Sequence, residues 1–218
     1  QLFNMPDAIP VGGAIRAATG DRQIHVALSG NGKRLFTSPS FGNEVRAWDA
    51  ATGREVARAV ELQFDPSLMK ADEAGGLIAG ANNVYGEISI VRFTGGKASI
   101  YTGKPPSTGE VVESIDITAE GSLVACGRSK SVEVLDARSG RSKAILTLKD
   151  ENCLEVFFAA DSDRLMFGTS KARVCDWNWK NGKDYRVVAA MPDAITKFRP
   201  APDGRSVLIG CRDGTTAL

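Results

Sequence analysis

The sequence predicts an all-β protein built from repeated units, and three observations support this prediction. Turn sequences recur with a nearly constant period, short apolar runs flank each turn, and no segment keeps a helical apolar period over three turns. The 218 residues are 43% hydrophobic, which is enough for an extensive core, and 23 Gly with 9 Pro suit a fold with many tight turns. We therefore expect almost no helix.

Two series of turns carry the repeat. In the first, alternating segments end on glycines that are 43, 44 and 42 residues apart, namely Gly53, Gly96, Gly140 and Gly182. In the second, turns lie between short apolar runs with steps of 42, 47, 41 and 42 residues, at Gly32, Ala74, Gly121, Ser162 and Gly204. Asn-Gly and Asp-Gly turns between β-rich runs indicate hairpins. Two interleaved series that share one period are hard to obtain by chance.

A period of about 43 residues with four short strands predicts a β-propeller, in which each repeat builds one four-stranded antiparallel blade. We expect one domain over 1–218 with about five repeats, the first and last incomplete, at 1–53, 54–96, 97–140, 141–182 and 183–218. Either residues 2–5 pair with the strand that ends at Leu218 and close a five-bladed ring, or the chain is an excerpt of a seven-bladed ring. We prefer the excerpt, because the sequence opens without Met and stops in the middle of a strand.

Several segments resemble the WD-repeat propeller family. The segment 29–36 is similar to its inner hairpin, and 45–49 is similar to its third strand, which ends here in Trp48-Asp49. The later repeats are degenerate: Leu135-Asp136 and Cys175-Asp176 keep only the aspartate, and Val91-Arg92 keeps neither residue. The resemblance implies a non-enzymatic scaffold that positions protein partners, with Trp48 as the best-buried tryptophan between neighbouring blades.

Composition and motifs narrow the function further. Twenty-seven basic and 26 acidic residues give a net charge of +1, so we expect neither nucleic acid nor a membrane surface as a partner. One histidine, His25, and no hydrolase or phosphate-loop motif predict no catalytic, cofactor-binding or metal-binding residues and no enzyme activity. The four cysteines are expected to be buried, reduced thiols in strands, namely Cys126, Cys153, Cys175 and Cys211. Reduced thiols in turn favour an intracellular, cytoplasmic protein.

The predicted partner-binding surface is the end of the propeller where the second and third strands of each blade connect. A mixed aromatic and basic set falls there, which suits a protein or peptide partner: Phe41, Tyr85, Arg128, Lys130, Lys171 and Arg212. We expect acidic residues at the same end, among them Asp65, Glu151 and Asp193. An inserted segment at 6–22 is also expected there. Two alternatives remain: a ligand-sensing propeller of a larger multidomain regulator, and a propeller enzyme related to quinoproteins.

Overall fold

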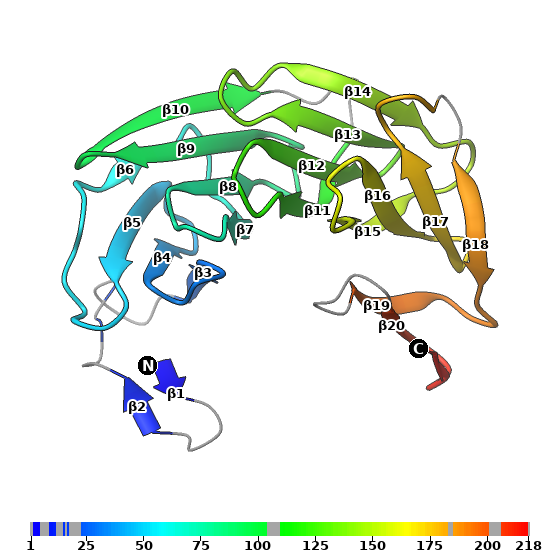
Figure 1. Ribbon diagram of the computed structural model, residues 1–218, viewed down its shortest axis with the longest axis horizontal. Coiled ribbons are helices and arrows are strands. Elements are labelled where there is room, and N and C mark those ends of the chain that lie inside the picture. Colours follow the sequence, from blue (N-terminus) through cyan, green and yellow to red (C-terminus); the bar gives the residue numbers. More distant parts are fainter. Residues whose placement is uncertain are drawn as a thin grey trace. The chain divides into compact units, whose positions relative to one another are not determined.

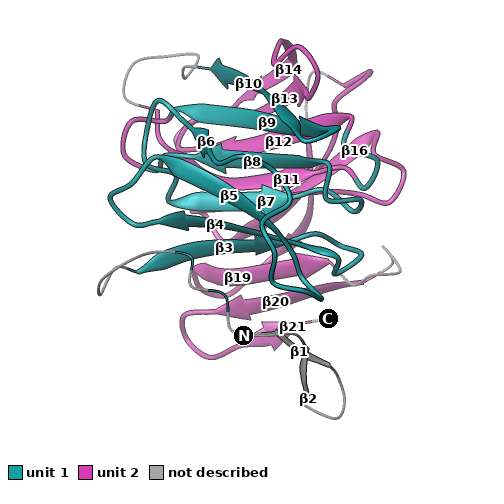
Figure 2. Ribbon diagram, turned by 90° about the vertical axis from the view of Figure 1, so that its left-hand side faces the viewer, with its two compact units in different colours: residues 1–83, 87–104, 119–121 teal, residues 84–86, 105–118, 122–218 magenta. Residues whose placement is uncertain are grey.

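The computed structural model describes residues 2–4, 9–11, 15, 17, 23–103, 110–182, 185–200 and 206–217. Every regular element within these ranges is a β-strand, which confirms the all-β prediction (Figure 1). No helix in the described part of the chain is long and apolar enough to cross a membrane. The chain divides into two compact units, residues 1–83, 87–104 and 119–121 in one and residues 84–86, 105–118 and 122–218 in the other (Figure 2).

Unit 1 holds two four-stranded antiparallel sheets, which we name blades 1 and 2. Blade 1 consists of β3 (Ile24–Leu28), β4 (Arg34–Pro39), β5 (Glu44–Asp49) and β6 (Val60–Glu61). Blade 2 consists of β7 (Leu68–Ala71), β8 (Leu77–Ala81), β9 (Ile88–Thr94) and β10 (Lys97–Gly103). Their facing sides form one apolar core, in which the rings of Phe36 and Phe93 lie 5.6 Å apart.

Unit 2 holds blades 3 and 4, with four strands each, and blade 5 with three described strands. Blade 3 is β11 (Val112–Ile117), β12 (Leu123–Arg128), β13 (Ser131–Asp136) and β14 (Ser142–Thr147); blade 4 is β15 (Cys153–Phe158), β16 (Arg164–Thr169), β17 (Arg173–Asn178) and β18 (Arg186–Ala190). Blade 5 is β19 (Ile195–Pro200), β20 (Val207–Cys211) and β21 (Thr216–Ala217). One apolar core joins blades 3 and 4, and a second joins blades 4 and 5.

The inner hairpins lie where the second turn series predicts them. Gly32, Gly75, Gly121 and Ser162 each adopt a positive φ of 57–71° between the first and second strands of their blades. The position predicted for Ala74 is therefore held by Gly75, one residue later, because a left-handed backbone favours glycine. Gly204, the fifth turn of the series, lies outside the described residues.

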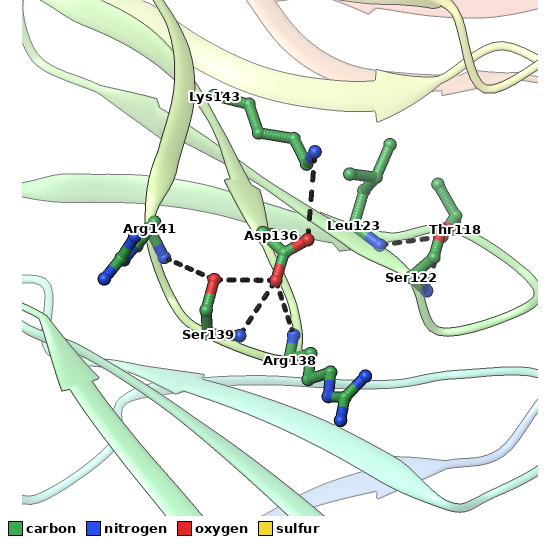
Figure 3. A network of polar contacts seen from close by, with 8 residues as sticks. All are labelled: Thr118, Ser122, Leu123, Asp136, Arg138, Ser139, Arg141 and Lys143. Carbon is green, nitrogen blue, oxygen red and sulfur yellow. Dashed lines mark hydrogen bonds and ion pairs between the residues drawn. The ribbon is translucent and has the colours of Figure 1, made fainter.

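In blades 1, 3 and 4, an aspartate or asparagine side chain closes the turn between the third and fourth strands. In blade 3, Asp136 Oδ1 accepts hydrogen bonds from the backbone N–H and the hydroxyl of Ser139, both at 2.8 Å (Figure 3). Asp49 and Thr52 repeat this arrangement in blade 1. The hydroxyl and the N–H of Ser139 hold the pKa of the Asp136 carboxyl below its ordinary value.

Strand register corrects the predicted alignment of the fourth repeat. Arg34 pairs with Asp49 in blade 1 and Arg164 pairs with Asn178 in blade 4, so the counterpart of Trp48-Asp49 is Trp177-Asn178 rather than Cys175-Asp176. The prediction that Trp48 is the best-buried tryptophan is also wrong, since Trp48 is 8% exposed and Trp177 only 2%. Trp177 belongs to the core between blades 3 and 4, whereas Trp48 is not part of the core between blades 1 and 2, and its indole N–H donates to Thr37 Oγ1 at 2.9 Å.

Two segments depart from the regular blade pattern, residues 2–11 and residues 54–58. β1 (Leu2–Asn4) pairs antiparallel with β2 (Ile9–Val11) in a two-stranded sheet. The segment predicted as the fourth strand of blade 1, residues 54–58, contributes only a bridge from Trp48 to Glu55, and the ladder resumes at β6. Most of the predicted insertion at 6–22 and the terminal Leu218 lie outside the described residues.

Candidate partner-binding surface

The six predicted contact residues lie at the connections between second and third strands, which we name the bc turns. Phe41 lies between β4 and β5, Tyr85 between β8 and β9, and Lys130 between β12 and β13. Lys171 and Arg212 occupy the bc turns of blades 4 and 5, and Arg128 is the last residue of β12. The predicted chain positions are therefore correct, but the surroundings of these side chains differ greatly.

Phe41, in unit 1, is 92% exposed. The N–H of Gly42 donates to the carbonyl oxygen of Pro39 at 3.0 Å, which makes Phe41 the third residue of a four-residue turn. Its φ of 60° is a conformation that such turns usually give to Gly or Asn. The N–H of Phe41 donates to Asp65 Oδ2 at 2.7 Å, and this bond holds the turn. A large apolar ring is thus displayed to solvent on a backbone that costs about 1–2 kcal/mol to adopt.

A second exposed apolar turn follows β8. Val84 and Tyr85, at its tip, are 63% and 70% exposed. The base of the turn is closed by a bond from the N–H of Asn82 to the carbonyl oxygen of Glu87 at 2.9 Å, and Gly86 has a φ of 70°. Tyr85 therefore stands on a closed turn, which lowers the entropy lost when its ring is covered by a partner.

Arg128 does not contact solvent, so the prediction that it binds a partner directly is wrong. Its side chain is fully buried in unit 2, where Nη1 donates to the carbonyl oxygen of Gly86 at 2.7 Å and Nε to Glu133 Oε2 at 3.3 Å. Glu133 itself is 5% exposed. The guanidinium is enclosed because it neutralises this buried carboxylate and meets the carbonyl of the neighbouring turn. Arg128 thus positions the turn that carries Tyr85.

The three remaining cations, all in unit 2, are exposed. Lys130 and Lys171 are open to solvent at their turns. Arg212 is paired with Asp193 of the same blade, with Nη2 at 2.9 Å from Oδ1 and Nε at 3.3 Å from Oδ2. The hydrogen bond and the charge of Asp193 raise the pKa of Arg212. The pKa of Asp193 is lowered, mainly by the hydrogen bond from the N–H of Ala194 and secondly by the hydrogen bond from Arg212. Arg212 is therefore less available to a partner than the two lysines.

Glu151, expected near this end as an exposed acid, is buried. Its Oε1 accepts a hydrogen bond of 2.5 Å from the Tyr185 hydroxyl, which raises the pKa of Tyr185 to about 12. Burial alone would raise the pKa of the Glu151 carboxyl, but the Tyr185 bond and the charge of Arg173 lower it on balance. Glu151 is therefore part of the interior of blade 4 and adds no charge to the surface.

The histidine and the four cysteines, which are residue types common in catalytic and metal sites, have surroundings typical of structural residues. His25 lies in β3, and its Nε2 is 3.1 Å from Ser40 Oγ, as expected for a satisfied strand histidine. All four cysteines are free and buried, which confirms that prediction, and burial raises the pKa of Cys126 to about 12. Among the described residues, no three His, Cys, Asp or Glu side chains form a group that could hold a metal ion.

Sequence reasoning missed two features. Val84 adds a second exposed apolar side chain to the Tyr85 turn, and it could have been found by its place between Asn83 and Tyr85 in a predicted loop. The second is a cluster of Arg164, Asp176 and Arg186 in blade 4. The repeat pattern aligns Asp176 with Asp49, whereas aligning Trp177 with Trp48 gives Asn178 as the counterpart of Asp49.

Comparison with known proteins bears on the fold. No family model matches the sequence, and no curated protein matches it. Among solved structures, the chain is similar to the β-propeller domain of Cps50 (Swd1) from Myceliophteria thermophila, with a TM-score of 0.68 and 14% identity. The chain is a β-propeller. The match covers 88% of this chain and 66% of that domain, so the chain spans about two thirds of its neighbour's length.

Proposed function

We propose that this propeller is a non-enzymatic interaction module of the WD-repeat type, whose bc turns bind a protein or peptide partner in a larger assembly. The observation that carries the proposal is Phe41, an almost fully exposed ring on a left-handed backbone. The left-handed backbone lowers the stability of the unbound chain, the exposed ring gains no burial that would offset this cost, and glycine at this position would avoid it. A residue that lowers the stability of the unbound protein in this way is typical of a binding site.

Two features support the rest of the proposal. In unit 2, the Tyr85 turn adds a second exposed aromatic ring, fixed from beneath by Arg128. Lys130 and Lys171 supply exposed cations at the same kind of turn. Within unit 2, the Tyr85 ring and the two lysines favour a partner that offers apolar side chains and acidic ones.

The test is a binding measurement with peptides selected against the wild-type protein from a displayed library. Phe41→Gly removes the ring and relieves the backbone strain, so we expect the variant to be more stable by about 1 kcal/mol and to bind the selected peptides at least about 10-fold more weakly. The matched control is Ile100→Ser, which removes an exposed apolar side chain from β10, away from the bc turns. Unchanged peptide affinity in Phe41→Gly, or an equal loss in the control, would overturn the proposal.

A further inference from the structure

Blade 4 contains a charged pocket at the end opposite to its bc turn. The pocket has a volume of about 440 Å³ and is lined by Arg164, Asp176, Asn178, Tyr185 and Arg186. These residues come from β16, β17 and the start of β18, close to the inner hairpin and to the turn between third and fourth strands. None of the six predicted contact residues takes part in it.

Asp176 is the centre of the cluster, and its side chain is 3% exposed. Oδ1 accepts from Arg164 Nε at 2.9 Å, and Oδ2 accepts from Arg164 Nη2 and, at 2.7 Å, from Arg186 Nε. The two arginine side chains are 38% and 69% exposed. One buried carboxylate therefore orients two guanidinium groups that remain open to solvent.

An acid at this position is exceptional among the repeats. Asp176 pairs with Met166, which is the third pair between the second and third strands of blade 4. The third pair is Phe36 with Ala47 in blade 1, Ala79 with Ile90 in blade 2, and Ala125 with Val134 in blade 3. All of those side chains are buried and apolar. Because an apolar residue fits this row in three other blades, and because burying a carboxylate is costly, folding alone does not account for Asp176.

The pocket carries an excess of positive charge and of hydrogen-bond donors. Two guanidinium groups and one carboxylate leave a net charge of +1, since Asn178 is neutral and the pKa of Tyr185 is raised to about 12. Within the described residues, Arg164 Nη1 and both terminal nitrogens of Arg186 have no partner. Asn178 Oδ1 accepts from the N–H of Asn181 at 3.2 Å, which leaves the Nδ2 amide as a further donor.

We propose that this pocket binds a phosphoryl group, either as free phosphate or on a phosphorylated side chain. Donors from two arginines and an amide suit a ligand with three acceptor oxygens and two charges better than a single carboxylate. Asp176 holds Arg164 Nη2 and Arg186 Nε in place, so the donors are ordered before the ligand arrives.

The experiment titrates the protein with inorganic phosphate and follows by NMR the Nε–H signals of Arg164 and Arg186, which shift when a ligand binds the terminal nitrogens of the same guanidinium groups. We expect saturable shifts of both signals, and at least a 10-fold weaker affinity in Arg186→Gln. The matched control is Arg46→Gln, which removes a partly exposed arginine already paired with Glu44 and Glu55 and should leave the affinity within 2-fold. No saturable shift, or equal affinity in wild type and Arg186→Gln, would overturn the proposal.

A second pair of titrations distinguishes the sources of the phosphoryl group. A phosphoserine peptide that displaces inorganic phosphate and binds more tightly would support a phosphorylated partner. A peptide that fails to displace phosphate would support the free ion. If the same peptide with glutamate in place of phosphoserine bound equally well, the phosphoryl assignment would be wrong. Failure of these titrations leaves the Phe41 proposal untouched, because the Phe41 turn shares no residue with this pocket.

Discussion

Blades 3 and 4 both bury a charge cluster, but one cluster is closed and the other is open. In blade 3, Arg128 and Glu133 are 0% and 5% exposed, and the guanidinium also meets the carbonyl of Gly86. In blade 4, Asp176 is buried while Arg186 is 69% exposed at its side chain. The closed cluster positions a turn, whereas the open cluster has donors to spare for a ligand. The two clusters therefore differ in the solvent exposure of their arginines, which leaves donors for a ligand in blade 4 and none in blade 3.

The largest expected effect is at the closed cluster. Arg128→Met should lower the free energy of unfolding by about 3–5 kcal/mol, because it leaves Glu133 buried without a counter-ion and the carbonyl of Gly86 without its donor. Urea denaturation measures the loss. The double variant with Glu133→Leu should recover most of it, since no buried charge then remains. A loss below about 1 kcal/mol would show that Glu133 reaches water and that the cluster is not closed.

The open cluster should respond less to the same kind of change. Asp176→Ala removes the buried carboxylate, but Arg164 and Arg186 can turn into solvent, so we expect a loss of about 1–2 kcal/mol in the free energy of unfolding. The measurement is again urea denaturation, with Arg128→Met as the reference. A loss as large as that of Arg128→Met would contradict the distinction between the two clusters.

The turns of the two blades offer a smaller, pH-dependent contrast. The pKa of Asp136 is lowered from its ordinary value of 3.8, so the native state is stabilised by its carboxylate above that pH, and this stabilisation is lost as the pH falls through the lowered pKa. Asp136→Asn, which copies Asn178 of blade 4, should remove this part of the acid sensitivity and change stability at neutral pH by about 0.5–1.5 kcal/mol. Thermal unfolding followed from neutral to acid pH tests this. An unchanged acid profile would mean that Asp136 does not contribute to it.

The smallest effect is expected at Arg186. Arg186→Gln should change the free energy of unfolding by no more than about 0.5 kcal/mol, because the side chain is largely exposed and Arg164 still neutralises Asp176. Calorimetry of both proteins at matched ionic strength gives the value. A loss near that of Asp176→Ala would assign Arg186 a structural role and weaken the proposal that its donors serve a ligand.

The sequence by itself determined the all-β class, the repeat and, to within one residue, the positions of four inner turns. These follow from local physics: a residue at Gly32 or Gly121 must adopt a positive φ, and apolar alternation on either side defines strands whatever lies next to them. The same local reasoning placed all six predicted contact residues at or beside bc turns. It also indicated that the cysteines and His25 are structural.

The tertiary structure alone decided which of those residues face solvent. Arg128 and Lys130 are two residues apart and both basic, yet one lies buried against Glu133 and Gly86 while the other is exposed. Likewise, Asp136 closes a turn and Asp176 orients two arginines, although both follow an apolar residue at the same apparent place in the repeat. Register fixes which face of a strand a side chain takes, and a shift of one or two residues is invisible in a degenerate repeat. Burial depends on the neighbouring blade and charge pairing on the strand register, and no local pattern contains either of them.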